Sequence, residues 1–438
     1  MGVSDRARLN PVDSSRREGR ATQPRHVLLA VSIGNMLEWY DFAVYGFLTP
    51  VIARIMFPSG DPTASLLLSA GAFGVGFLTR PAGALVFGGL ADRKGRKFTL
   101  LLTFGLMGAA TLAIGLIPSF AILGLAAPLL VVFARLLQGL AAGGAVGGAT
   151  AMLTEHAPPG RAGYFASWQA ASQAGALLLG ALAAATVSAL VSPEQLNAWG
   201  WRVPFFASAL IVPLGLYIRR RIDDPEEFVR RERAASSPLR QLWRTHRAAV
   251  ARGFGITIIW TVSTYFFFVY VPLYAHTVLK LPMSDTLFTN SLALAFMLCI
   301  APVAGHLSDR WGRYSPMIAA ALAIVLLIRP GFGFLLSHPH VEALAAFQVV
   351  SAVLAAMFIG PAPAAIAELF PIGVRSSGMG VAYNFSVTLF GGFAPFIATG
   401  LIARTGNPLS PTWYVMFSCG LSLIALLLTL RTSSRDPC

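Results

Sequence analysis

Charged residues are scarce in this chain of 438 residues: only 12% are charged, whereas 55% are hydrophobic. Soluble globular domains are about 25% charged, so the composition excludes an ordinary soluble protein. The three cysteines are too few and too scattered for a disulfide framework or a metal site. No pair among the seven histidines has metal-ligand spacing. We therefore expect no metal, no cofactor and no enzymatic activity.

What the chain has instead is long apolar runs along almost its whole length. A membrane-spanning helix needs about 20 predominantly apolar residues. The sequence predicts an all-α membrane protein with twelve such helices, with boundaries accurate to a few residues. The predicted helices lie near 27–52, 64–91, 98–117, 121–143, 163–191, 203–219, 250–275, 286–308, 315–336, 342–367, 377–403 and 411–430.

The net charge of +14 is distributed unevenly between the two sides of this predicted helix array. With a cytoplasmic N-terminus, 26 of the 33 Lys and Arg residues fall in cytoplasmic tails and loops. This asymmetry follows the positive-inside rule, so both termini are predicted to be cytoplasmic. The basic residues are therefore interpreted as an orientation signal and not as a nucleic-acid surface. The apolar run after residue 26 is too long for a signal peptide and contains Glu38 and Asp41, so no cleavage is expected.

The chain also contains an internal repeat. GGLADRKGRK begins at Gly88 and GHLSDRWGRY at Gly305, and both follow the pattern G-x-x-x-D-R-x-G-R with a separation of 217 residues. Two related six-helix halves are a transporter architecture, with the substrate near the bilayer midplane between them. The predicted parts are an N-terminal tail (1–26), a first bundle (27–218), a cytoplasmic linker (219–249), a second bundle (250–430) and a C-terminal tail (431–438).

These repeated loops, together with Arg135 in RLLQG, resemble the motifs of the major facilitator superfamily. Within it, several stretches resemble the metabolite:proton symporter family, and most closely its citrate and tricarballylate members. The stretches are GNMLEWYDF (34–42), GFLTRPAGALVFGGLADRKGRK (76–97), ARLLQGLAAG (134–143), GYFASWQAASQ (163–173) and WGWRVPFF (199–206). The resemblance implies the major facilitator fold and proton-coupled transport of a small solute. The family's substrates include citrate, tricarballylate, 2-oxoglutarate, shikimate, proline and betaine.

Four ionisable residues are predicted deep inside the helices of the first half. Glu38 and Asp41 on helix 1, Arg80 on helix 2 and Arg135 on helix 4 all lie about 17–21 Å from a helix end. A charge at the bilayer centre costs at least about 2.5–3.5 kcal/mol, so each one needs a functional or structural reason. The helices of the second half have no comparable charge in their middle stretches.

The two arginines are candidates to bind an anion, because a guanidinium matches a carboxylate with two parallel hydrogen bonds. The alternative is that each arginine only neutralises Glu38 or Asp41. Gln169 and Gln173 are four residues apart and share a helical face, so both are candidates to line the same site. Hydrogen bonding between helices is the alternative for these two. The second half is expected to contribute Tyr265, Tyr383 and Asn384.

Glu38 and Asp41 are candidate proton carriers, since a buried carboxylate has a raised pKa. A fixed ion pair with an arginine is the alternative. Related transporters have a glutamate after the RLLQG motif where this chain has Ala145. Symport therefore depends on Glu38 or Asp41, and facilitated transport stays open.

Ionisable residues also recur at the predicted cytoplasmic helix ends of both halves, where ion pairs between helices would close a gate. A pure orientation signal is the alternative. The predicted gate residues are Asp92, Arg96, Glu155, Arg161, Asp309, Arg313, Glu368 and Arg375.

The sequence thus predicts a monomeric carrier in the bacterial inner membrane that imports a di- or tricarboxylate with protons by alternating access. Its expected partners are a small organic anion, protons and the lipid bilayer, without nucleic acid. A carrier of 2-oxoglutarate, shikimate or a betaine-like zwitterion is the alternative within transport. A nutrient sensor that does not transport is a further alternative, although such sensors often have large soluble extensions that the short predicted tails do not provide.

Overall fold

The computed structural model describes residues 24–94, 96–208, 242 and 244–433. Within these ranges the chain is helical and contains no strand. Among the described residues, ten helices are long and apolar enough to cross a membrane, and Leu101–Leu116 is a shorter apolar helix. The predicted helix near 203–219 and the predicted linker lie largely outside the described residues, as does almost all of the N-terminal tail.

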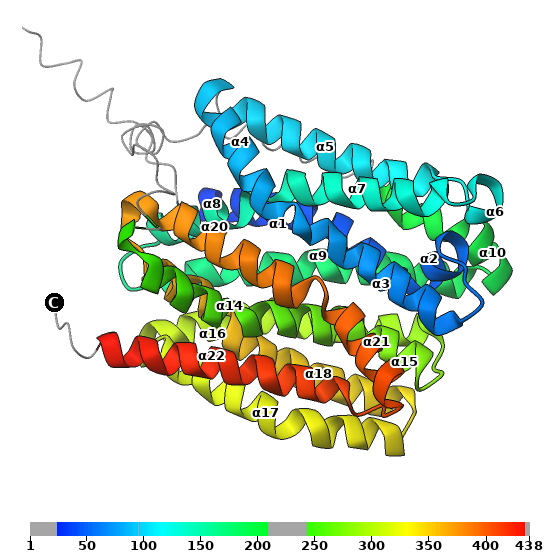
Figure 1. The fold of residues 1–438 in the computed structure, drawn as a ribbon. Coiled ribbons are helices and arrows are strands. Elements are labelled where there is room, and N and C mark those ends of the chain that lie inside the picture. The colour runs from blue at the N-terminus through cyan, green and yellow to red at the C-terminus, as the bar shows by residue number, and fades with distance from the viewer. Residues whose placement is uncertain (1–23, 95, 209–241, 243, 434–438) are drawn as a thin grey trace, which may run out of the picture.

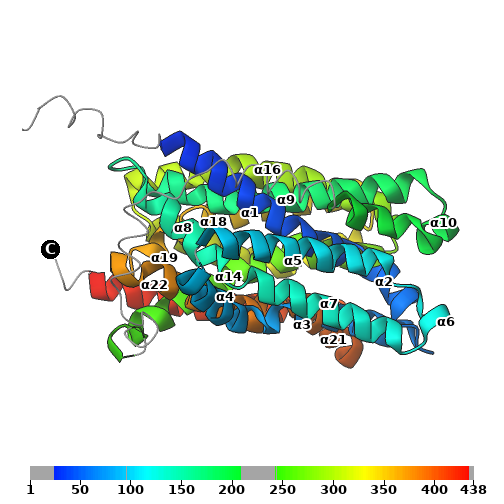
Figure 2. The same cartoon turned by 90° about the horizontal axis from the view of Figure 1, so that it is seen from above.

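The helices of the first half lie side by side in one bundle (Figures 1 and 2). Several predicted spans are divided into two consecutive helices, because the backbone is irregular near their middle. The elements are α1 (Pro24–Phe47), α2 (Thr49–Met56), α3 (Pro62–Leu78), α4 (Arg80–Lys94), α5 (Arg96–Leu116), α6 (Phe120–Leu123), α7 (Ala126–Ala142), α8 (Ala145–Glu155), α9 (Ala162–Leu190), α10 (Pro193–Ala198) and the 3₁₀ turn η2 (Gly200–Arg202).

The second half repeats this arrangement and contains two π-helical turns, η3 and η5. Its elements are α14 (Arg247–Tyr265), η3 (Phe266–Tyr270), α15 (Val271–Thr277), α16 (Met283–Trp311), α17 (Tyr314–Ser337), α18 (Val341–Ile359), α19 (Ala362–Ala367), the 3₁₀ turn η4 (Ile372–Val374), α20 (Arg375–Ser386), η5 (Val387–Gly391), α21 (Ala394–Thr405) and α22 (Pro411–Ser433).

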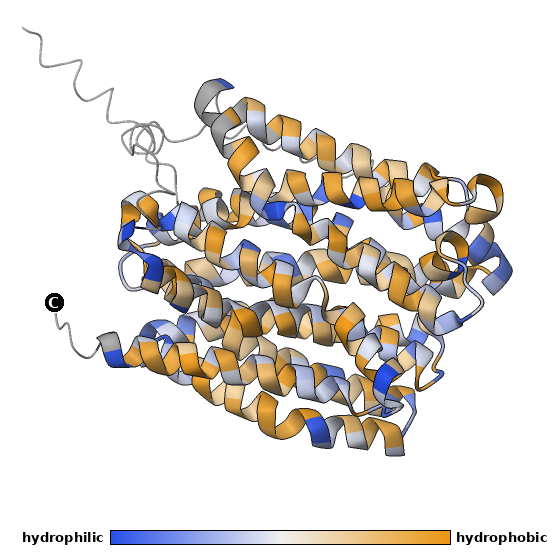
Figure 3. Cartoon of the chain, in the orientation of Figure 1, coloured by the Kyte–Doolittle hydropathy of each residue, from blue (hydrophilic) through white to orange (hydrophobic). Residues whose placement is uncertain are grey.

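Apolar residues cover the helices, while hydrophilic residues concentrate at the two ends of the bundle (Figure 3). In a bilayer every backbone polar group must be bonded internally, so apolar segments of this length form helices. Local caps fix some of their ends: the Asp61 side chain accepts hydrogen bonds from the backbone of Thr63 and Ala64 at the start of α3. We call the end of the bundle where α9 and α20 begin the motif end, and the other the opposite end.

The fourth membrane-spanning segment, formed by α7 and α8, differs from the prediction of 121–143. It begins at Ala126 and continues through a break at Gly143 and Gly144 to Glu155. The apolar residues 120–123 form the separate helix α6, which ends at Gly124 with a φ of +54°. Arg135 consequently lies about 14 Å from the start of its helix at a rise of 1.5 Å per residue, closer to the opposite end than expected.

The two halves meet along long helix pairs. α9 packs against α16, α8 against α20, and α3 against α21. At the motif end the contact is close enough for backbone atoms to touch: a Cβ on Gly163 would lie 2.5 Å from the carbonyl oxygen of Gly305. The most deeply buried of the described spans runs from α14 to α15, where 94% of the residues in its most apolar stretch are buried. In α17, on the outside of the bundle, only 33% of the corresponding residues are buried.

Candidate functional site

The four ionisable residues predicted inside the first half are all buried. Glu38 and Asp41 lie on α1, Arg80 begins α4, and Arg135 lies on α7. Both arginine side chains are completely inaccessible, with relative exposures of 0%. The bundle therefore encloses two cations and two acids in one half, as the arrangement of charge along the sequence predicts.

The guanidinium of Arg80 is surrounded by aromatic rings from both halves. Cation–π contacts of this kind form within about 6 Å of a ring centroid and strengthen when they are desolvated. The rings belong to Trp39, Phe42, Phe77 and Tyr383, with centroids 5.1, 5.2, 5.4 and 6.0 Å from the guanidinium carbon. We call these four rings the Arg80 box.

Within this box Arg80 makes no hydrogen bond to any described residue through Nε, Nη1 or Nη2. Its nearest acid is Glu38, whose Oε1 lies 3.9 Å from Nη2, too far for a hydrogen bond. The hydroxyl of Tyr265, whose ring packs against Trp39 and Phe77, makes no hydrogen bond of normal geometry with a described residue, although it lies close to Arg80. The centre of the molecule thus presents several buried donors without acceptors, an arrangement that favours an anion.

Arg135 is equally buried but is held by neighbouring groups. Its Nη1 donates to Oε1 of Gln138 at 2.7 Å, and its Nη2 donates to the carbonyl oxygen of Phe73 at 3.1 Å. Gln138 in turn donates to Thr111 at 2.7 Å. Arg135 therefore ties α7 to α3 directly and to α5 through Gln138. This bonding favours a structural role over direct contact with a substrate, and it is a different role from the predicted neutralisation of Glu38 or Asp41.

The two acids of helix 1 have different surroundings. Glu38 faces Arg80, as described above. Asp41 is 3% exposed and lies beside the hydroxyls of Thr111 and Ser208, within electrostatic range of Glu38 and Arg135. Asp41 therefore adjoins the hydrogen-bonded group of Arg135, Gln138 and Thr111, outside the Arg80 box.

Gln173, Tyr383 and Trp260 connect the two halves near the Arg80 box. The indole Nε1 of Trp260 on α14 donates to Oε1 of Gln173 on α9 at 3.1 Å. Nε2 of Gln173 reaches the hydroxyl of Tyr383 on α20 at 3.5 Å. Each of the three side chains is at most 3% exposed. Sequence reasoning selected Gln173 and Tyr383 but not Trp260.

Gln169 and Asn384, also selected from the sequence, bond elsewhere. Nε2 of Gln169 donates to Oδ1 of Asn35 on α1 at 3.0 Å, a contact within the first half. Nδ2 of Asn384 donates to the carbonyl oxygen of Gly143 at 2.7 Å, where helix 4 is broken. Gln169 therefore follows the alternative of helix–helix bonding, whereas Asn384 links the halves two residues from Ala145.

At the motif end, Asp309 of the second half binds the first half. Its two carboxylate oxygens accept hydrogen bonds from the backbone N–H groups of Gly163 and Tyr164 at 2.7 and 2.9 Å. A carboxylate at a helix N-terminus is favoured by the free N–H groups and by the helix dipole. Asp309 thus caps α9 from the neighbouring half.

Arg313 holds this capping carboxylate in place. It pairs with Asp309 at 2.6 Å and with Glu368 at 2.9 Å. Although burial alone would lower the pKa of the Arg313 guanidinium, the two carboxylates raise it above its ordinary value. Three of the predicted gate residues therefore form one ion-pair group that touches the first half.

The other predicted gate residues divide into two sets. Glu155 at the end of α8 pairs with Arg375 at the start of α20 at 3.7 Å, again between the halves. Arg161 is exposed and forms no ion pair with a described residue. The side chains of Asp92 and Arg96 lie outside the described part of the structure.

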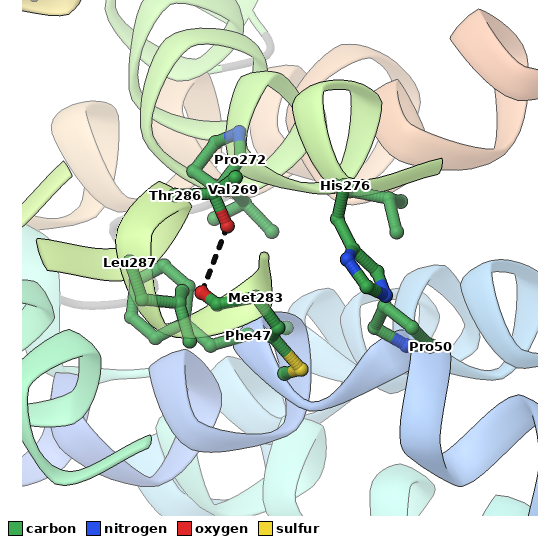
Figure 4. A pocket seen from close by; sticks show the side chains of 10 residues that line it. Phe47, Pro50, Val269, Pro272, His276, Met283, Thr286 and Leu287 are labelled. Atoms are coloured by element: carbon green, nitrogen blue, oxygen red, sulfur yellow. Dashed lines mark hydrogen bonds between the residues drawn. The ribbon is translucent and has the colours of Figure 1, made fainter. Parts of the chain in front are cut away.

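Between the Arg80 box and the opposite end the halves meet through larger side chains. A Cβ on Gly74 would lie 2.5 Å from the Phe393 ring, and one on Gly392 would lie 2.4 Å from the Phe77 ring. A small pocket lies nearby, between Phe47 and Pro50 of the first half and Val269, Pro272 and His276 of the second (Figure 4). No group of three or more His, Cys, Asp or Glu side chains among the described residues could hold a metal ion.

The Arg80 box is the part of this site that sequence reasoning missed. Trp39 and Phe42 are three residues apart on α1, beside Glu38. Phe42 follows Glu38 by four residues, and Phe77 precedes Arg80 by three within one predicted helix. These two spacings, which place a ring beside a charged residue, were the available signal. The contribution of Tyr383 depends on how the halves assemble, and helical spacing does not contain that information.

The sequence is similar to those of known membrane transporters. The Major Facilitator Superfamily profile matches residues 31–330. The chain is 36% identical over 407 residues to the citrate-proton symporter of Salmonella typhi, covering 91% of this chain and 93% of the relative. It is 33% identical over 407 residues to the alpha-ketoglutarate permease of Escherichia coli, covering 92% of both.

A solved structure shows the same fold. The D-xylose-proton symporter superimposes with a TM-score of 0.72 at 17% identity, covering 93% of this chain and 97% of that one. These matches confirm the predicted family, the predicted fold and the predicted role as a multi-pass membrane transporter. The chain belongs to the Major Facilitator Superfamily.

Proposed function

We propose that this transporter imports a small organic anion, a di- or tricarboxylate, together with protons by alternating access. The observation that carries the proposal is the bonding state of Arg80. Its three nitrogens are buried between the halves and make no hydrogen bond of normal geometry with a described residue. The nearby Tyr265 hydroxyl is also buried and makes no such bond. An unbonded buried donor costs about 1–3 kcal/mol, and more when it is charged.

A carboxylate is the ligand that best fits this arrangement of donors. A guanidinium presents its N–H groups in a planar fork that bonds both oxygens of a carboxylate at once. Because Glu38 approaches no nearer than 3.9 Å, it balances the charge without filling the fork. The rings of the Arg80 box exclude water, which strengthens the electrostatic attraction to an anion. The printed names of the citrate and alpha-ketoglutarate carriers among the relatives support the same class of substrate.

A betaine-like zwitterion is the second candidate. Trp39 and Tyr265 pack against each other at 6.2 Å, and Glu38 directly precedes Trp39 in the chain. Aromatic faces beside a carboxylate suit a quaternary ammonium group. A proline/betaine transporter of Salmonella typhimurium is 30% identical over 423 residues, covering 94% of this chain. This candidate predicts binding of glycine betaine in preference to succinate or citrate.

The proposed orientation places the motif end in the cytoplasm, with both termini on that side of the bacterial inner membrane and with the monomer as the working unit. The excess of Lys and Arg in the loops at that end supports it. The cap of Asp309 on α9 and the Glu155–Arg375 pair would then close the cytoplasmic gate. Both contacts join the halves, so both must break when the transporter opens inward.

The test is uptake by purified protein in liposomes with an imposed proton gradient. The solutes are citrate, tricarballylate, 2-oxoglutarate, succinate, shikimate and glycine betaine. For the transported carboxylate, Arg80→Ala should raise the concentration for half-maximal uptake by about 10- to 100-fold, the loss expected for charged hydrogen bonds. Arg80→Lys keeps the charge without the fork and should fall between. Arg329→Ala is the control, because Arg329 stacks on Trp413 far along the chain from the site and is exposed.

Monodisperse elution and an unchanged melting temperature would show that the Arg80 variants fold. Folded Arg80→Ala protein that takes up carboxylates like the wild type would disprove the anion site. Uptake of glycine betaine alone would replace the proposal with the second candidate.

A further inference from the structure

The hydrogen bond between Trp260 and Gln173 joins the two halves at the centre of the molecule. The indole Nε1 of Trp260 donates to Oε1 of Gln173 at 3.1 Å, and both side chains are 1% exposed. Since α9 belongs to the first half and α14 to the second (Figure 1), this bond breaks whenever the halves separate at this depth. The transport cycle therefore has to provide another acceptor for a buried donor.

We propose that Trp260 and Tyr383 form a second substrate anchor, which binds the polar group at the end of the substrate remote from Arg80. In the state described, the amide oxygen of Gln173 takes the place of that group. The proposal rests on the proposed function, since it assumes that one carboxylate of the substrate binds Arg80. It adds the requirement that the substrate has a second polar end.

The chemistry of the three side chains supports this role. An indole N–H only donates hydrogen bonds, and a tyrosine hydroxyl that accepts one bond still has its own proton to donate. Tyr383 accepts from Nε2 of Gln173 at 3.5 Å, at the limit of a hydrogen bond. A carboxylate oxygen is a stronger acceptor for both donors than the amide oxygen of Gln173, because it is charged. An anionic group would therefore displace Gln173 in preference to a neutral one.

The positions of the two anchors limit the size of the substrate. The Tyr383 ring lies 6.0 Å from the guanidinium carbon of Arg80, and its centroid lies 5.1 Å from that of the Trp260 ring, so this tyrosine of the second anchor also borders Arg80. A molecule that spans the two needs only a short carbon chain between its polar ends. Small di- and tricarboxylates meet this condition, whereas a monocarboxylate engages Arg80 alone.

The experiment compares matched ligands that differ by one terminal carboxylate, replaced by hydrogen. The pairs are succinate with propionate and 2-oxoglutarate with 2-oxobutyrate. Dissociation constants are measured by calorimetry on the full-length purified protein. Trp260→Phe keeps the ring and removes the N–H donor, and Trp413→Phe is its control on the exposed surface of α22. Trp260→Phe should reduce the preference for the longer member of a pair by about tenfold, with little change for the shorter member.

A second variant separates this role from a structural one. Gln173→Leu keeps a similar volume and leaves Trp260 without its internal acceptor. If Gln173 occupies the position of the substrate, this variant binds the longer ligand at least as tightly as the wild type. If the Trp260–Gln173 bond only stabilises the protein, both variants weaken both members of a pair equally and the inference is wrong.

The remaining outcomes distinguish the two proposals. Wild-type protein that binds a carboxylate but does not discriminate within any pair would overturn the second anchor and leave the Arg80 site standing. Wild-type protein that binds no carboxylate would remove the proposed function, and the second anchor with it.

Discussion

Arg80 and Arg135 show how little residue type and burial alone determine function. Both are arginines, both are 0% exposed, and both contact the Phe42 ring, at 5.2 and 4.9 Å. Arg135 donates to Gln138 and to a backbone carbonyl, whereas Arg80 has no such partner among the residues described. Gln138 lies one turn after Arg135, so the sequence contained part of this distinction. The carbonyl of Phe73 could only be assigned once α3 and α7 were packed.

The same comparison separates the two acids of helix 1. Glu38 is the acid next to Arg80, and Asp41 lies beside Thr111 and Ser208. We predict that Asp41→Asn abolishes uptake driven by a proton gradient but leaves exchange of labelled for unlabelled substrate, which needs no net proton movement. Glu38→Gln should mainly change substrate affinity, because it removes the charge that balances Arg80. Both are measured in liposomes with and without a proton gradient.

Asp41→Asn protein that still concentrates substrate when only a proton gradient drives it would contradict this assignment. Proton coupling would then have to pass through Glu38 or another ionisable group, since Ala145 itself cannot carry a proton. An exchange activity lost together with accumulation would instead indicate that Asp41 is required for the conformational cycle itself.

At the scale of helices, the internal repeat extends from the sequence motifs to the backbone. The fourth membrane-spanning segment (α7 and α8) breaks at Gly143, and the tenth (α18 and α19) breaks at Gly360. These glycines are separated by the same 217 residues as the two motif loops. Helix 1 is interrupted at Leu48, and the corresponding position in helix 7 directly precedes the π-helical turn η3. The sequence predicted the repeat from loop motifs. The breaks escaped prediction because an interruption of the backbone leaves hydropathy unchanged.

Glycine packing between the helices of the first half gives a second prediction. A Cβ on Gly139 of α7 would lie 1.7 Å from the carbonyl oxygen of Gly76 on α3, and backbone cannot move away as a side chain can. We expect Gly139→Ala to destabilise the protein by about 1–3 kcal/mol or more, as overpacking does. Gly420→Ala on α22 is the control, since nothing lies within 4 Å of its Cβ and alanine is the better helix former.

Thermal unfolding in detergent, followed by fluorescence-detected size exclusion, measures both glycine variants. The expected result is a lower melting temperature for Gly139→Ala and an equal or higher one for Gly420→Ala. Equal melting temperatures would mean that α3 and α7 lie farther apart than described. In the Gly-rich stretch 139–148, the atom nearest to a Cβ on Gly139, Gly143 or Gly147 is in each case a backbone atom of another helix.

At the scale of the whole molecule, the sequence predicted which polar residues are buried at the centre better than the contacts that those residues make. Gln169 and Gln173 share one helical face, yet Gln169 bonds to Asn35 and Gln173 to Trp260. The first contact lies within a half and the second between the halves, and no periodicity in α9 distinguishes them. The imbalance of charge between the halves was readable from the sequence, since it depends only on which helices contain ionisable residues.

The motif end carries the last prediction, which concerns the relative position of the halves. Asp309 accepts two backbone hydrogen bonds from α9, so Asp309→Asn replaces a charged cap between the halves by a neutral one. A cap and its interaction with the helix dipole contribute about 1–2 kcal/mol, which corresponds to a shift of about 5- to 30-fold between closed and open states. Asp285→Asn is the control, because Asp285 lies at the other end of the same helix.

Double electron–electron resonance between spin labels at Pro159→Cys and Gly373→Cys measures this shift, in protein whose native cysteines are replaced by serine. Both labelled positions are exposed, and they lie at the motif end on different halves. Asp309→Asn should increase the population with a long distance between the labels, while Asp285→Asn leaves the distribution as in the wild type. Because Arg313 pairs with both Asp309 and Glu368, the neutral variant also leaves Arg313 with one carboxylate fewer. An unchanged distribution would mean that backbone packing of Gly163 against Gly305 is sufficient to keep this end closed.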